Sequence, residues 1–365
     1  MTRHISIWLL LTALVLAACN SDEGQTGTQQ KTTLQILSCQ KDFNVVDHFV
    51  TRGLPDGFTT AVTPEEGTSI MLFLTMGTND KSHNGEFFYY TDGKWRSDIN
   101  ITADLCHIYG YMPSTGNGSI TPLESDYAKG TVMSFTDLPS ITPEDPCVIT
   151  GIKQVDFNSP TLTLVDFTKA DVKEGCFEYT IRASQLGNFL YVLLDHLYAG
   201  LEFRFQVNGD YAKLRTIKLK KVELKGTQAP TVSPVVTLRA NATGASPIES
   251  IEWNEAGSGT GYVEIFNNTA GEELKTAFSD SPVATAQFAP ISSETQSMTM
   301  KCTYDVYVKN GSLIGERHAE NRISQVAGMV RGKKRIITVT VNPTYIYKLA
   351  DPDLDNPDNP EITIN

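Results

Sequence analysis

Short segments in which apolar and polar residues alternate make up most of the chain after residue 32. Alternation at period two is typical of β-strands with one buried face, and Gly, Pro, Asn and Asp between the segments favour turns. The clearest segments are residues 70–74, 87–90, 107–111, 162–165, 177–181 and 201–207. Many short strands separated by turns indicate an all-β protein built from β-sandwiches.

One segment departs from this alternation. Its apolar residues recur at intervals of three and four and are Leu186, Phe189, Leu190, Leu193, Leu194 and Leu197. Such spacing places all six side chains on one face of a helix. We therefore expect one short helix near residues 186–198, capping an open end of a sandwich.

The pattern changes again near residue 226. An alternating strand over residues 214–224 ends at Gly226, and the stretch after it contains Pro230 and Pro234 without periodicity. A second set of strand-like segments follows. The length of the chain, 365 residues, allows two domains of the usual ~100–200 residues. We expect an N-terminal β-sandwich over residues 53–226 and a C-terminal β-sandwich with a C-terminal extension over residues 227–365.

The N-terminus has a pattern of its own, an apolar run over residues 5–18 that follows Arg3 and ends in Leu-Ala-Ala, directly before Cys19. The run is too short to span a bilayer, which needs ~20 apolar residues. A basic start and small residues at the end are typical of a removed signal. We interpret residues 1–18 as a lipoprotein signal peptide and Cys19 as the lipidated residue, which would carry acyl chains such as palmitate. The polar residues 19–31 then form a flexible tether.

Charge and cysteine content bear on three possibilities: nucleic-acid binding, a metal site and disulfides. The formal net charge is −12, which argues against nucleic acid because Lys and Arg must neutralise phosphates. Neither a Cys-x-x-Cys pair nor a histidine at zinc-site spacing occurs, so no metal site is expected. Two interpretations stay open for the cysteines: buried free thiols, or one disulfide among Cys106, Cys147 and Cys176. The cysteines other than Cys19 are Cys39, Cys106, Cys147, Cys176 and Cys302.

The sequence holds no recognisable catalytic motif. His-Glu-x-x-His, Gly-x-Ser-x-Gly and the phosphate loop are all missing. The glycine-rich residues 257–261 precede a strand instead of a helix, so they do not form a helix-end phosphate site. His196 is interpreted as a packing or capping residue and not as a metal ligand. We expect no enzyme activity and no cofactor.

Several motifs occur in a particular order along the chain. They are Thr51-Arg52-Gly53 after a first strand, residues 87–90 running into Gly93-Lys94-Trp95, residues 108–113, residues 196–203, residues 342–347 and residues 351–357. Together with the lipoprotein start, this order resembles the fimbrillin-like lipoproteins, the subunits of type V pili. The resemblance covers most of residues 40–225 and the C-terminal end.

The resemblance implies two transthyretin-like, Greek-key β-sandwiches and a maturation route. A lipidated precursor reaches the outer membrane, and an arginine-specific protease removes the first strand. The groove left behind accepts a strand from another pilus subunit, giving a homo- or hetero-polymer that serves cell adhesion as a fimbrium on the cell surface. Applied to this chain, residues 32–52 contain the removed strand, and cleavage falls between Arg52 and Gly53.

The C-terminal end is the expected source of the donor strand. Residues 336–341 and 345–349 form two alternating segments broken at Pro343, and two isoleucines follow a proline-rich spacer. The candidate donor residues are Val339, Val341, Tyr345, Tyr347, Ile362 and Ile364. The alternative for residues 336–341 is that they complete the second sandwich of their own chain.

A second function stays open, that of a surface glycan-binding lipoprotein in a nutrient-uptake system. Such a protein needs an exposed aromatic platform, for which Trp95, Trp253, Tyr109 and Tyr111 are the candidates. Within the pilus interpretation, the sequence does not distinguish a stalk subunit from a tip or accessory subunit.

Overall fold

The protein is described from a computed structural model. It describes residues 34–45, 58–61, 67, 69–76, 80–91, 94–96, 105–154, 172–180, 188–240, 246–256, 261–291, 296–309, 311–323, 326–341 and 362–364. The expected signal peptide, tether and cleavage site lie outside these residues.

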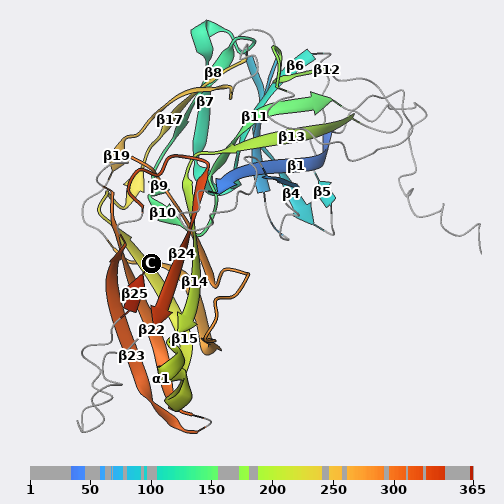
Figure 1. The fold of residues 1–365 in the computed structure, drawn as a ribbon. Helices are drawn as coiled ribbons and strands as arrows, with labels where there is room; N and C mark the ends of the chain where they lie inside the picture. The colour runs from blue at the N-terminus through green and yellow to red at the C-terminus, as the bar shows by residue number, and fades with distance from the viewer. Residues whose placement is uncertain are drawn as a thin grey trace, which may run out of the picture.

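The described part of the chain is almost entirely β-structure. It contains 25 strands, one short α-helix and two 3-10 turns, and the prediction of an all-β sandwich fold is confirmed. No helix among the described residues has the length and apolar content that a membrane span requires. Figure 1 shows the strands arranged in two halves that follow one another along an elongated molecule.

The longest sheet runs through both halves. Its strands are, in spatial order, β10 (Ile141–Thr142), β21 (Ala284–Phe288), β14 (Ala199–Val207), β24 (Lys333–Val341), β1 (Leu34–Val45), β13 (Asn188–His196), β11 (Cys147–Gln154), β6 (Leu105–Met112), β3 (Ser69–Met76), β4 (Asp80–Thr91) and β5 (Lys94–Arg96). Three further strands pair with members of this sheet: β12 (Glu178–Thr180) with β6, β2 (Phe58–Ala61) with β1, and β25 (Ile362–Ile364) with β24.

Three smaller sheets complete the fold. The first contains β18 (Ile248–Glu252), β17 (Val235–Arg239), β8 (Gly130–Phe135) and β7 (Gly118–Pro122). The second contains β20 (Val263–Glu273), β15 (Arg215–Gly226), β22 (Met298–Val308) and β23 (Leu313–Ile323). The third contains β19 (Glu255–Ala256), β16 (Thr231–Val232) and β9 (Leu138–Pro139).

Two separate clusters of buried apolar side chains hold these sheets together. The first core lies between the β13–β11–β6–β3 part of the long sheet and the sheet of β7, β8, β17 and β18. The second core lies between β14, β21 and β24 on one side and β15, β22 and their neighbours on the other. Each core is therefore enclosed by two sheets, which is the architecture of a β-sandwich.

The division of strands between the two cores does not follow the chain order at residue 226. Strands β14 and β15 precede this residue and line the second core, whereas β17 and β18 follow it and line the first. The alternating strand over residues 214–224 thus contributes to the second core. Periodicity shows that a strand has a buried face, but it does not show which sheet that face covers.

Strand β15 shows how the alternation is used. Ile217 and Leu219 point into the second core, and so do Val222 and Leu224. The step from 219 to 222 breaks the period of two, and the pairing of β15 with β22 shifts between Leu219 and Lys221. This β-bulge places an extra residue on the solvent side and returns the following apolar residues to the core.

The helix expected near residues 186–198 is absent, because residues 188–196 form strand β13. From Leu190 to Leu194 every side chain is buried, so both faces of the strand are covered. A continuous apolar run of this length occurs in buried strands as well as in helices, and periodicity alone does not separate the two. The partners of β13 decide the outcome, since β11 and β1 pair with its two edges.

The one α-helix of the described residues is α1 (Gly209–Leu214), which connects β14 to β15. It begins after Asn208, whose side-chain oxygen accepts hydrogen bonds from the backbone N–H groups of Asp210 (2.9 Å) and Tyr211 (3.2 Å). This cap satisfies two of the donors that a helix N-terminus leaves unpaired. The two 3-10 turns are η1 (Ser114–Gly116) and η2 (Leu123–Ser125).

The side chains of four cysteines are described, and all four are buried and outside any disulfide: Cys106, Cys147, Cys176 and Cys302. The interpretation of these residues as buried thiols is confirmed. The alternative, a disulfide among the first three, is not formed. Burial in apolar surroundings raises the pKa of Cys106 and of Cys176 to about 12, so both are protonated small hydrophobes at neutral pH.

One buried histidine lies beside an acidic side chain in the first half of the molecule. The His107 side chain on β6 lies opposite Glu178 on β12, with Nε2 4.0 Å from Oε1. Neither ring nitrogen has a hydrogen-bond partner among the described residues. Burial lowers the pKa of His107 below its ordinary value of 6.5, and the opposing effects of Glu178 and Asp126 are smaller.

We therefore expect the free energy of unfolding to decrease as the pH falls below 6.5. Between the folded and the unfolded pKa of His107 the unfolded chain binds more protons, so acid favours unfolding by at most about 1.4 kcal/mol per pH unit from this residue. His107→Leu should reduce that slope. Urea unfolding of both proteins on either side of pH 6.5 measures the difference, and identical slopes would contradict the prediction.

Candidate functional site

Strands β13 and β14 follow each other in line and pass from the first half of the molecule into the second. The side of each strand on which β1 or β24 pairs is called the long edge. Only Leu197 and Tyr198 separate β13 from β14 in the chain, and both residues are buried. On the other side, β13 pairs with β11 and β14 pairs with β21. The long edge is covered by two strands from the two ends of the chain, β1 and β24.

Strand β1 covers the β13 part of the edge. It runs parallel to β13 from the pair Leu34 with Asn188 to the pair Lys41 with Leu194, with an irregularity between Ile36 and Ser38. On its other side, residues 40–43 pair with β2 in antiparallel orientation. Strand β1 thus lies between β13 and β2, and Figure 1 shows it crossing the first half beside β13.

Strand β24 covers the β14 part. Its pairing is parallel and continuous over eight residues, from Gly200 with Lys334 to Val207 with Val341. The start of β24 also meets the end of β1, since Asn44 and Val45 pair with residues 333–334. The first and last long strands among the described residues, β1 and β24, therefore lie along the same line of strands, each in its own half.

The segment beyond β24 returns to the same place. Strand β25 pairs in antiparallel orientation with β24, from Val339 with Ile364 to Val341 with Ile362. This contact extends over three residue pairs only, in contrast to the eight that join β24 to β14. Strand β25 is consequently the least extensively paired part of this edge.

Loss of β1 would leave β13 unpaired on one side. The register joins seven residue pairs, so a row of backbone N–H and C=O groups would lose its partners. An unpaired strand edge is a template for strand addition by another chain. The β13 side chains from Leu190 to Leu194 are buried, and apart from the hydroxyl of Tyr191 they are apolar.

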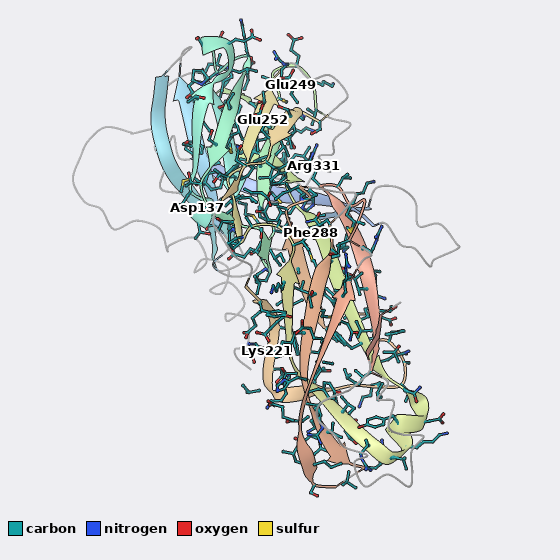
Figure 2. All side chains as sticks on the ribbon, turned by 90° about the vertical axis from the view of Figure 1, so that its left-hand side faces the viewer. Asp137, Lys221, Glu249, Glu252, Phe288 and Arg331 are labelled. Carbon is teal, nitrogen blue, oxygen red and sulfur yellow. The ribbon has the colours of Figure 1, made fainter. Side chains whose placement is uncertain are left out.

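A polar cluster fixes the junction between β13 and β14. Asp195 is 1% exposed and forms an ion pair with Arg331, with Nη1 3.0 Å from Oδ2. The same guanidinium donates to the carbonyl oxygen of His196 (3.3 Å), and the Ser246 hydroxyl donates to Asp195 (3.0 Å). Figure 2 shows Arg331 where the two halves meet. The cluster ties the chain just before β24 to the end of β13.

A second polar group lies beside it and contains metal-ligand atoms. Cys147 and His196 are opposite each other on β11 and β13, and the Cys147 sulfur is 3.5 Å from His196 Nδ1. Asp145 Oδ1 is 2.9 Å from the same nitrogen. The three ligand atoms all lie within 4.8 Å of one another. Sequence reasoning did not find this group, because His196 is 49 residues from Cys147 and only the sheet brings them together.

The expected donor residues have different positions. Val339 and Val341 are 0% and 1% exposed and belong to the second core of their own chain. Ile362 and Ile364 lie in β25. Tyr345, Tyr347, Cys19, Arg52 and Gly53 lie outside the described residues. Strand β24 thus has the position that the alternative for residues 336–341 anticipated, completing the sheet of its own chain.

The candidate aromatic platform for glycan binding does not form from the tyrosines. Tyr109 and Tyr111 are buried in the first core. Trp253 is partly buried, packs against Tyr198 with ring centres 5.9 Å apart, and lines a groove of about 350 Å³ together with Ile251 and Val330. The side chain of Trp95 lies outside the described residues.

Comparison with solved structures gives several matches that extend over nearly the whole chain. A candidate cell adhesion protein from Bacteroides fragilis is 12% identical, with a TM-score of 0.45 over 92% of this chain and 97% of that one. A candidate cell adhesion protein from Bacteroides uniformis is 11% identical, with a TM-score of 0.41 over 93% and 98%. A fimbrial protein from Bacteroides vulgatus is 12% identical, with a TM-score of 0.38 over 92% and 98%.

The name of the Bacteroides vulgatus protein, a fimbrial protein, is consistent with the resemblance of the sequence motifs to fimbrial subunits. No protein-family model matches the chain, and no curated protein matches it.

Proposed function

We propose that this chain is a fimbrillin-like pilus subunit that is exported as a lipoprotein, cleaved after Arg52 and polymerised by strand exchange at the cell surface. It has a structural role and no enzymatic one. Its partners are other pilus subunits, an arginine-specific protease and, through Cys19 in the precursor, the outer membrane. The observation that carries the proposal is the position of β1 on the edge of β13.

The position of β1 suits a strand that is removed. It ends at Val45, which is upstream of Arg52, so cleavage there separates β1 from the rest of the chain. Strand β13 lies downstream of Arg52 and therefore stays in the cleaved chain. Once β1 has left, the unpaired edge and the apolar side chains of β13 favour a replacement strand from a neighbouring subunit.

The C-terminal contacts suit a donor that lies beyond Val341. Strand β24 is held by its own second core, whereas β25 has three residue pairs on the outer edge of β24. Release of β25 and of the residues before it leaves the eight-residue pairing of β24 with β14 in place. We therefore assign the donor to residues 342–365, which contain Tyr345, Tyr347, Ile362 and Ile364.

Substitution of Arg52 tests the first step. Arg52→Lys keeps the positive charge but removes the side chain that an arginine-specific protease requires. We expect this variant to stay lipidated, to retain residues 19–52 and not to polymerise. Mass spectrometry of the protein released from cells should give Gly53 as the N-terminal residue of the wild type and Cys19 as that of the variant.

The matched control is Arg239→Lys, a conservative change at a partly exposed position on β17. It should be processed and assembled like the wild type. Normal polymerisation of Arg52→Lys, or a mature N-terminus other than Gly53, would contradict the proposal.

A further inference from the structure

We propose that Asp145, Cys147 and His196 form a Zn²⁺ site at the end of β13. This site is independent of strand exchange and of the processing at Arg52. Thiolate sulfur, imidazole nitrogen and carboxylate oxygen are the three ligand types that proteins offer to Zn²⁺. The structure brings one of each together, on two neighbouring strands and the loop before one of them.

Each ligand is positioned by a regular element. Cys147 is the first residue of β11, and its register partner is His196, the last residue of β13. Asp145 lies two residues before Cys147, in the loop that follows β10. The backbone N–H of Leu197 donates to the carbonyl oxygen of Pro146 at 2.8 Å, which holds this loop against the end of β13. The three side chains are thus directed to one point by the sheet itself.

The sulfur–nitrogen spacing agrees with a tetrahedral centre. Zn–S and Zn–N bonds of about 2.3 and 2.05 Å at a tetrahedral angle place the two ligand atoms about 3.5 Å apart. The Cys147 sulfur and His196 Nδ1 are 3.5 Å apart. Asp145 Oδ1 is 2.9 Å from Nδ1 and would move away by about 0.5 Å to reach a tetrahedral nitrogen–oxygen separation. A carboxylate in a loop can make this adjustment without moving a strand.

The surroundings favour a bound cation that is partly shielded from water. The Cys147 and His196 side chains are fully buried, and the Asp145 side chain is 15% exposed. Arg331 is the nearby positive group, and its charge is paired with Asp195. Three protein ligands leave a fourth position for water, which has access on the side of Asp145. Binding displaces the proton of the Cys147 thiol to solvent, because the thiolate is the ligand, and the neutral His196 ring carries its proton on Nε2 so that Nδ1 is free for the metal.

A metal at this point would join β11, β13 and the loop after β10. It would therefore strengthen the end of β13 where the long edge passes from the first half into the second. Because Zn²⁺ binds the folded arrangement, and His196 is far from Asp145 and Cys147 in an unfolded chain, binding should raise the melting temperature of the protein.

Metal binding by the full chain tests this site. After treatment with a chelator, the protein is incubated with Zn²⁺ alone and separated from unbound metal, and the bound metal is measured by elemental analysis. We expect one tightly held Zn²⁺ per chain in the wild type and a loss of it in Cys147→Ala. Co²⁺ used in place of Zn²⁺ should give the visible absorption of a tetrahedral thiolate complex, and that absorption should vanish in Cys147→Ala.

The control is Cys302→Ala, which removes another fully buried thiol, in the second core. It should bind Zn²⁺ like the wild type. Asp145→Asn provides a second test at a less buried position, and it should weaken binding while the chain stays folded by circular dichroism. If the wild type retains no Zn²⁺, or if Cys147→Ala retains as much as Cys302→Ala, the three residues are a hydrogen-bonded group only and the proposal is wrong.

Discussion

A chain that ends at Val341 should fold and be cleaved but should not polymerise. The truncation removes β25 and the residues before it, and leaves all eight pairs between β24 and β14. Loss of the donor removes several apolar side chains from the contact between subunits, at about 1.5–3 kcal/mol each, so we expect assembly to be abolished. Electron microscopy and sedimentation measure assembly, and thermal unfolding followed by circular dichroism measures folding.

A chain that ends at Gly332 is the matched control. It lacks β24, whose Ile337, Val339 and Val341 are buried in the second core. Loss of three such side chains costs roughly 5–9 kcal/mol, which is comparable to the whole stability of a typical domain. This shorter chain should not fold. If the chain ending at Val341 still forms fibres, the donor lies elsewhere, and if it fails to fold, residues 342–365 belong to the core of their own subunit.

Arg331→Met should destabilise the protein by about 3 kcal/mol, because removal of one partner leaves the other charge of a buried pair without compensation. The charge left behind is that of Asp195, which is 1% exposed, whereas Arg331 itself is 29% exposed at the side chain. Methionine keeps much of the apolar stem, so the change reports mainly on the ion pair and the hydrogen bond to His196. Guanidinium unfolding of the two proteins gives the difference.

Arg239→Met serves as the comparison for this effect. Arg239 also binds two acidic groups, Glu124 at 3.1 Å and Glu249 at 3.0 Å, but both carboxylates are about half exposed. Exposed ion pairs contribute little to stability, since water already solvates their charges. We expect a much smaller change than for Arg331→Met, and equal effects of the two substitutions would show that the junction pair is not a specific stabilising contact.

The contrast between β14 and β13 shows where pattern reasoning succeeds and where it fails. In β14, buried Leu201, Phe203 and Phe205 alternate with partly exposed residues, and the sequence predicts the strand correctly. In β13 the alternation is lost, because both faces of the strand are covered. The remaining apolar run fits a helix by its spacing, and only its neighbours β1 and β11 make it a strand.

The chain's own residues determined the all-β class, the positions of most strands and the resemblance to pilus subunits, because these depend on local alternation, composition and motif order. Tertiary structure alone decided that β1 pairs with β13 and β24 with β14. It also decided that strands before residue 226 line the second core while strands after it line the first. Only the tertiary structure brings Asp145, Cys147 and His196 together. These contacts join residues that are far apart in the chain. Local pattern specifies which face of a strand is buried, whereas the choice of partner depends on long-range packing.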